Sequence, residues 1–405
     1  MAAHMAAPTP RHDVLADRCL AAALALSEAA ARADFRGPDP FDGLWWHWPR
    51  ALVGGRRRRQ AVAQLHARSP IDVRRLYRRR HPQTAKALGV FASVEARAQR
   101  LAAADAPRDA GLRAVAALDA DRSAGPVAWG YPWDVQTRWS FYPAGSPNVV
   151  VTAFAASGLL EAGAGMGRGD LVDRAHGAAG WVRDELWVEP EGYFAYHAGR
   201  PVNIHNASLL GAWLVDVAGG AEPIARERVA RAVRRTLDAQ RPDGSWPYGE
   251  GRNLAWADSF HSGYVLLCLD RLRAVDDRVD DAVRRGAAHY RRFFDAAGRA
   301  RLWADKPFPE DGHSAGTGLS ALSALAQRGV IERELLERVA LRVLEHGLRG
   351  GRAVHRRYRW GTTTVRYLRW CDAHVALGLV DAAAALRSAG DPRPQQTAAA
   401  PARRA

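Results

Sequence analysis

Polar residues, three of them histidines suited to proton transfer, recur at regular intervals along most of this sequence. Five short polar segments each precede an apolar stretch, and their markers are Asn148, His205, His261, His313 and Arg369. The steps between these markers are 57, 56, 52 and 56 residues. A period of this size, filled by two helices and a loop, indicates an array of helical hairpins. The polar segments therefore occupy equivalent places in successive hairpins.

Three of the segments carry pairs of groups suited to acid–base chemistry. The expected catalytic residues are Asp258 with His261, Asp311 with His313, His205, and the nearby phenol Tyr248. A carboxylate beside an imidazole orients it and tunes it as a general base. The structural alternative is that each aspartate only caps the helix that begins there, and that Tyr248 only packs against Trp246. Because the pairs recur, we expect them to face one cleft.

Neighbouring loop residues suit the binding of a sugar, and an acidic sugar in particular. The expected substrate-binding residues are Asp134, Arg138, Asn206, Trp133, Trp256, Trp303, Arg366 and Arg369. Arginine binds a carboxylate through two parallel hydrogen bonds, and indole faces suit sugar rings. The alternatives are core packing for the tryptophans and a salt-bridged loop for Asp134 with Arg138.

The residue types leave the reaction open. Two carboxylates among Asp134, Glu250, Asp258, Glu310 and Asp311 would suit hydrolysis of a glycosidic bond. A lyase or epimerase would instead neutralise a uronate with Asn206 or Arg369 and remove its C5 proton with a histidine or tyrosine.

No cofactor or metal is expected. The histidines and aspartates lack compact ligand spacings such as HExxH or CxxC, and no P-loop or GxSxG elbow occurs. Cys19, Cys268 and Cys371 are too few for a disulfide framework, and the chain opens without a secretory signal pattern. We find no apolar run long enough to span a membrane, and we expect a cytoplasmic protein.

The charge balance points to an anionic partner, with a compositional alternative. The 405 residues carry a net charge of +15, and only Lys86 and Lys306 among the basic residues are not arginine. This bias is typical of a GC-rich genome, but it also suits an acidic ligand. Arginines cluster at 56–59, 74–80 and 352–369, the last mixed with aromatics. Because no nucleic-acid module is recognisable, we expect an acidic oligosaccharide or polysaccharide rather than nucleic acid.

The hydrophobic pattern predicts an all-α fold. The second helix of each hairpin is apolar nearly all round, at 149–163, 207–219, 261–272, 314–325 and 370–382, whereas first helices such as 226–240 are amphipathic. This predicts an α/α toroid of about six hairpins, the first one or two irregular, forming a single domain over 11–387 with disordered tails at 1–10 and 388–405. All inner-helix N-termini would meet at one end, where unpaired N–H groups favour anions.

Eight ordered blocks resemble a known family. They are FRGPDPFDGL (35–44), LHARSPIDVRRL (65–76), WGYPWDVQTRWSFYPAGSPNVVVTAF (129–154), HNASLLGA (205–212), QRPDGSWPYGEG (240–251), WADSFHSGYVL (256–266), DGHSAGTGLSAL (311–322) and TTVRYLRWCDAHVALGL (363–379). With these blocks the chain resembles the VpsJ-like polysaccharide-biosynthesis family of α/α-toroid proteins. The resemblance implies a toroid and a capsule or exopolysaccharide context. It assigns no catalytic residue, and the segment 45–59 departs from the family pattern.

The segment QRPDGSWPYG also resembles the QW-type motif of terpenoid cyclases and prenyltransferases. In that motif Gln240 would cap backbone groups, Gly244 would turn the chain and Trp246 would pack. We therefore expect a carbohydrate-active toroid protein with hydrolase, lyase or epimerase chemistry. A non-catalytic glycan-binding protein and a terpenoid cyclase-like enzyme are the alternatives. A deep, apolar, aromatic-lined cavity would favour the terpenoid alternative.

Overall fold

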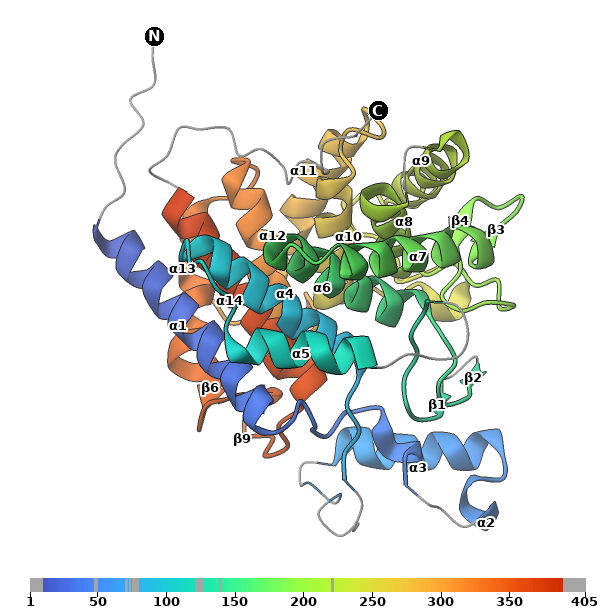
Figure 1. The fold of residues 1–405 in the computed structure, drawn as a ribbon, viewed down its shortest axis with the longest axis horizontal. Helices are drawn as coiled ribbons and strands as arrows, with labels where there is room; N and C mark the ends of the chain where they lie inside the picture. Colours follow the sequence, from blue (N-terminus) through green and yellow to red (C-terminus); the bar gives the residue numbers. More distant parts are fainter. Residues whose placement is uncertain are drawn as a thin grey trace.

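The computed structural model describes residues 10–46, 50–69, 72, 74, 80–120, 127–137, 140–219 and 222–388. Six helices of these residues form an inner ring: α4 (Ala85–Leu101), α6 (Val149–Met166), α8 (His205–Ala218), α10 (Ser259–Arg271), α12 (Gly312–Gln327) and α14 (Ala373–Arg387). Each contacts the next, and α14 contacts α4, so the ring is closed (Figure 1). The predicted all-α toroid is confirmed.

An outer layer of helices covers the ring. It consists of α1 (Pro10–Arg32), α5 (Asp109–Ala120), α7 (Gly169–Glu185), α9 (Pro223–Asp238), α11 (Val279–Tyr290) and α13 (Arg333–Arg342). Helix α1 packs against α14, so the first and last helices complete the sixth hairpin together. The predicted tails at 1–10 and 388–405 lie outside the described residues, except for Pro10 and Ser388.

Glycines let the inner helices approach closely. A methyl group on Gly89 of α4 would lie 2.3 Å from the carbonyl oxygen of Phe154, and one on Gly158 of α6 would lie 2.3 Å from that of Gly89. Gly316 and Gly378 make the same kind of crossing between α12 and α14. Because backbone lies against backbone at these crossings, larger side chains would force the helices apart. This explains the small-residue content of the inner helices.

Helix α6 is long and apolar enough, by length and composition alone, to cross a membrane. It is the one such helix among the described residues, and 61% of its 18 residues are buried within the protein. The expectation that no apolar run has this length is thus wrong for α6. Its residues are apolar because the helix is enclosed by α4, α7 and α8.

Short strands lie in the loops that lead from outer to inner helices. They pair antiparallel as β1 (Val135–Gln136) with β2 (Phe141–Tyr142), β3 (Trp187–Val188) with β4 (Tyr193–Phe194), β6 (Leu348–Arg349) with β7 (Arg352–Ala353), and β5 (Glu310–Asp311) with β8 (Arg356–Tyr358) and β9 (Gly361–Thr362). In the first pair, Val135 is opposite Tyr142. These ladders stiffen the loops at the N-terminal end of the inner ring.

Two further helices lie between α1 and α4, in agreement with the predicted irregular start of the array. Helices α2 (Arg50–Val53) and α3 (Arg56–Arg68) lie beside β1 and β2, off the end of the ring (Figure 1). Gln60 Nε2 donates a hydrogen bond to the Thr137 carbonyl at 2.9 Å, and Arg59 Nε donates to Gln136 Oε1 at 2.9 Å. Helix α3 is thereby fixed across the loop end of the ring.

The QW-type segment is structural, as predicted. Gln240 Nε2 donates hydrogen bonds to the carbonyls of Gly244 (3.0 Å) and Ala282 (2.9 Å). Gly244 has a φ of +83°, which favours glycine. Trp246 is buried, and its Nε1 donates to the Thr236 carbonyl at 3.0 Å. The segment ties the end of α9 to α11.

Candidate functional site

A cavity of about 670 Å³ lies at the loop end of the ring, under α3. Every inner helix contributes a residue from its start: Lys86 (α4), Asn148 (α6), Asn206 (α8), Asp258 and His261 (α10), His313 (α12), and Arg369 and Trp370 just before α14. Helix α3 adds Gln60 and Gln64 from the other side. The predicted convergence of inner-helix N-termini on one cleft is therefore confirmed. The volume is within the range of small-molecule sites.

Asp258 and His261 form a hydrogen-bonded pair at the start of α10. Asp258 Oδ1 accepts a hydrogen bond from the His261 backbone N at 2.9 Å, so Asp258 is the N-cap. Both of its oxygens also lie 2.9 Å from His261 Nδ1. A carboxylate can only accept, so Nδ1 carries a hydrogen, and in the neutral imidazole Nε2 keeps its lone pair. Asp258 is thus both the helix cap and the hydrogen-bond partner of the imidazole. This arrangement suits His261 to act as a general base.

Aromatic rings surround His261 on the cavity wall. The ring centroid of Phe260 lies 4.1 Å from that of His261, and Tyr248 lies at 4.5 Å. Tyr248 stacks on Trp256 at 4.3 Å, and Trp303 meets Trp256 edge-on at 6.1 Å. Burial raises the pKa of the Tyr248 phenol, so it stays neutral. These faces provide flat apolar surfaces beside the base.

A second set of polar side chains consists of Tyr264, further along α10, with His313 and His374. The Trp370 carbonyl accepts a hydrogen bond from His313 Nδ1 at 2.5 Å, which leaves His313 Nε2 as an acceptor. The Tyr264 hydroxyl, 3.2 Å away, donates to that nitrogen and lies 3.1 Å from His374 Nδ1. Burial lowers the pKa of both histidines, and the charge of Lys86 adds to the effect. The three groups form a neutral chain.

Two basic side chains, Lys86 and Arg369, border the cavity near these hydrogen-bonded histidines. Lys86, the second residue of α4, is only 3% exposed, and its Nζ lies 4.4 Å from the Phe154 ring centroid. Burial lowers the pKa of Lys86 well below its usual value, and the neighbouring charge of Arg369 adds to the shift. Arg369 is 2% exposed and lies in a π-helical turn, Leu368–Asp372, a distortion frequent at functional sites.

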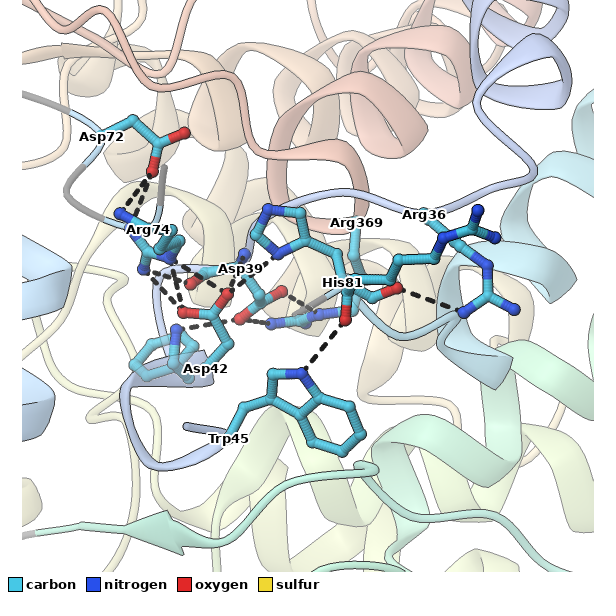
Figure 2. Close-up of polar contacts among 10 residues, drawn as sticks. Arg36, Asp39, Asp42, Trp45, Asp72, Arg74, His81 and Arg369 are labelled. Atoms are coloured by element: carbon cyan, nitrogen blue, oxygen red, sulfur yellow. Dashed lines mark hydrogen bonds and ion pairs between the residues drawn. The ribbon is translucent and has the colours of Figure 1, made fainter. Parts of the chain in front are cut away.

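The loop after α1 supplies the partner of Arg369. Arg369 Nε and Nη2 donate to the two carboxylate oxygens of Asp39 at 2.5 and 2.7 Å. Arg74 in turn donates to the Asp39 carbonyl at 2.7 Å and to Asp42 Oδ1 at 2.7 Å. Figure 2 shows Asp39 between Arg369 on one side and Arg74 with Asp42 on the other. This network fixes the loop that also brings Phe41 to the cavity.

Most of the residues expected from the sequence do line the cavity. Those that do so are Asp258, His261, His313, Tyr248, Asn206, Trp133, Trp256, Trp303 and Arg369. Their placement is as predicted, and their roles stay predictions. Arg138 lies outside the described residues.

His205 and Asp311, expected as catalytic residues, do not line the cavity. His205 is fully buried, with Nδ1 3.4 Å from Thr236 Oγ1, and burial lowers its pKa to about 4. Asp311 caps α12 by accepting from the Ser314 backbone N at 2.9 Å, and it pairs with Arg356 at 3.0 Å. Consecutive helical residues point about 100° apart. The cavity is therefore reached by the neighbours Asn206 and His313 instead.

Two expected binding residues are also elsewhere. Asp134 accepts from the Ala144 backbone N at 2.8 Å and closes its own loop, and Arg366 does not border the cavity. Glu250 is paired with Arg235 at 2.6 Å, and Glu310 with Arg342 at 2.8 Å. Asp258 is consequently the only carboxylate among the described lining residues.

Several residues of the site were not singled out from the sequence. They are Asp39, Lys86, Tyr264 and His374. Two signals pointed to them: Lys86 is one of two lysines in an arginine-rich chain, and Tyr264 follows His261 by three residues on one helix face. Within the described part of the chain, no three His, Cys, Asp or Glu side chains are grouped to hold a metal ion.

Solved structures share the fold at low sequence identity. Cellobiose 2-epimerase from Bacillus thermoamylovorans matches with a TM-score of 0.57 and 11% identity, over 74% of this chain and 87% of that chain. An unsaturated glucuronyl hydrolase specific for heparin matches with a TM-score of 0.60 and 10% identity, over 92% and 97%. A GH76 α-mannanase from Bacteroides thetaiotaomicron matches with a TM-score of 0.52 and 13% identity, over 75% and 86%.

The sequence itself gives no such match. No family model and no curated protein matches the chain. The structural neighbours are six-hairpin α/α-toroid enzymes that act on carbohydrates, and this chain has their fold.

Proposed function

We propose that this protein is a glycan-acting enzyme that removes a proton from a sugar carbon, as an epimerase or a lyase does. The base is His261 Nε2, and Asp258 holds the imidazole in the required tautomer and stabilises the imidazolium that forms. The observation that carries the proposal is the pairing of Asp258, the only carboxylate among the described lining residues, with His261.

The same observation counts against hydrolysis by two carboxylates. That mechanism needs an acid and a second carboxylate about 5 to 10 Å apart across the scissile bond. Glu250, Glu310 and Asp311 are each paired with an arginine, and none lines the cavity. Hydrolysis remains the competing outcome in the test below.

The substrate class rests on the walls of the cavity and on the fold. Trp256, Trp303 and Trp370 offer flat faces, while Asn206 and Gln60 offer amide groups for hydroxyls. The structural neighbours act on carbohydrates, which supports a sugar ligand. The resemblance to the VpsJ-like family supports a role in bacterial surface-polysaccharide biosynthesis. The small number of cysteines supports a location in the reducing cytoplasm.

The aromatic walls also favour a second candidate, a terpenoid cyclase-like enzyme. Tyr131, Tyr196 and Phe260 add to the tryptophans, and such an enclosure suits a prenyl chain. A cyclase that starts by protonation needs a carboxylic acid with a proton to give. Asp258 is an acceptor from both the backbone N and Nδ1 of His261, so the sugar proposal fits it better.

Incubation in D₂O with a panel of acidic and neutral bacterial glycans tests the proposal. After return to H₂O, deuterium stays only on carbon, so mass spectrometry should show one retained deuterium per processed sugar, or the double bond of a lyase product. Cleavage with neither carbon-bound deuterium nor a double bond in the product would establish hydrolysis instead. Turnover of farnesyl diphosphate would favour the terpenoid candidate, and binding without any reaction would favour a glycan-binding protein.

A further inference from the structure

The end of the cavity next to α4 is lined by two buried basic side chains. Arg369 and Lys86 are 2% and 3% exposed, and both line the cavity. Asp39 is the carboxylate bonded to Arg369, and of that guanidinium only Nε and Nη2 donate hydrogen bonds to its two oxygens. Arg369 Nη1 is buried without a hydrogen-bond partner among the described residues. Lys86 Nζ lies over the Phe154 ring, and the neighbouring charges that act on it are those of Arg369 and Asp39.

Such an arrangement is costly unless a ligand completes it. A buried cation or an unmade hydrogen bond to a charged group destabilises a protein by kilocalories per mole. Lys86 is also in the first turn of α4, where the helix dipole disfavours a positive charge. An anion placed here would gain a charge partner in Lys86 and a free N–H group of Arg369 at once.

We propose that Lys86 and Arg369 form a subsite for an anionic group, a carboxylate or phosphate, carried by the sugar substrate. This inference rests on the proposed function because it assumes that a sugar occupies the cavity. Lys86 Nζ lies 5.9 Å from the Tyr264 ring centroid, and Tyr264 follows His261 by three residues on α10. The anion would therefore anchor the sugar beside the base, and would make an acidic sugar the preferred substrate.

Binding at this subsite should be coupled to protonation. Burial keeps the pKa of Lys86 low in the empty cavity, and a bound anion raises it towards the usual value. Above the lowered pKa, binding therefore takes up a proton, and affinity falls as pH rises. The titratable and charged groups that face Lys86 are Arg369, Asp39, His313, His374 and Tyr264. The two histidines stay neutral because burial lowers the pKa of each.

Calorimetric titration with D-glucuronate, D-glucose 6-phosphate and D-glucose tests the subsite. The wild-type protein should bind at least one anionic probe about tenfold to a hundredfold more tightly than glucose. The binding heat should also differ between phosphate and Tris buffers by the uptake of a proton. Lys86→Met should abolish both the preference and the proton uptake, with glucose affinity within about twofold. Lys86→Arg should retain the preference without the uptake, and Lys306→Met serves as the matched control.

Two results would overturn the subsite. One is equal affinity of the wild-type protein for glucose and both anions, which needs no variant and so does not depend on how Lys86→Met folds. The other is an anion preference that survives in Lys86→Met. Failure of the proposed reaction looks different: Lys86-dependent anion binding with neither deuterium transfer to carbon nor an unsaturated product would retain the subsite and refute the proposed reaction. Deuterium transfer or an unsaturated product without anion preference would retain the reaction and refute the subsite.

Discussion

Replacement of His261 by glutamine should lower turnover about 10²- to 10⁴-fold, the usual contribution of a general base, with little change in sugar affinity. Glutamine can still form hydrogen bonds at this position, but it cannot take a proton from carbon. The readout is the rate at which carbon-bound deuterium from D₂O, or the double bond of a lyase product, appears in the processed sugar, measured with a binding titration of the same variant.

Asp258→Asn is the matched variant for the other half of the pair. Asparagine is as good an N-cap as aspartate, so α10 should keep its start and the protein its stability. It removes the carboxylate that fixes the His261 tautomer, so turnover should again fall by orders of magnitude. His346→Gln, at an exposed histidine that does not line the cavity, is the control and should be fully active. Full activity of both pair variants would refute the catalytic assignment.

Removal of the Asp39 charge should lower the free energy of unfolding by about 3 to 5 kcal/mol. Asp39 and Arg369 are each 2% exposed in their side chains and bonded through two hydrogen bonds. Asp39→Asn would leave Arg369 buried without a counter-ion and close to Lys86. Urea denaturation of the wild type and the variant measures the loss.

Two comparisons separate this cause from a general effect of substitution. Asp34→Asn breaks an ion pair with Arg36 whose side chains are 59% and 38% exposed, so it should cost no more than about 1 kcal/mol. The double variant Asp39→Asn with Arg369→Met removes both charges, keeps an oxygen acceptor for the Phe41 backbone N, and should be more stable than Asp39→Asn alone. A double variant that is less stable than Asp39→Asn would show that charge burial is not the origin of the loss.

The fold could be predicted because each hairpin has its own local pattern of apolar and polar residues, and this pattern repeats along the chain. The apolar stretches that became α6, α8, α10 and α12 are each long enough to form a buried helix, and their spacing requires an outer helix between them. The pattern could not predict that α3 lies over the ring, because the sequence of an amphipathic helix does not identify the surface against which it packs.

The site was predicted in part, for a related reason. Residues at helix starts could be assigned to one end of the ring, but the sequence does not say which of two neighbours points inwards. His205 and Asn206 differ by one helical step, and only Asn206 lines the cavity. The pairing of Asp39 with Arg369 joins residues 330 positions apart, and no local pattern encodes such a contact. The lowered pKa of Lys86 likewise results from its burial in the folded protein, which its sequence neighbours do not indicate.

The proposed function requires that a sugar enters this cavity beside His261. A crystal structure of the His261→Gln variant soaked with the glycan that the wild-type enzyme processes is the most direct test. A sugar ring should lie against Trp256 and Trp303, with the carbon that loses its proton within about 3.5 Å of the side chain at position 261. A glycan bound on the outer face of the ring, with the cavity empty, would contradict it.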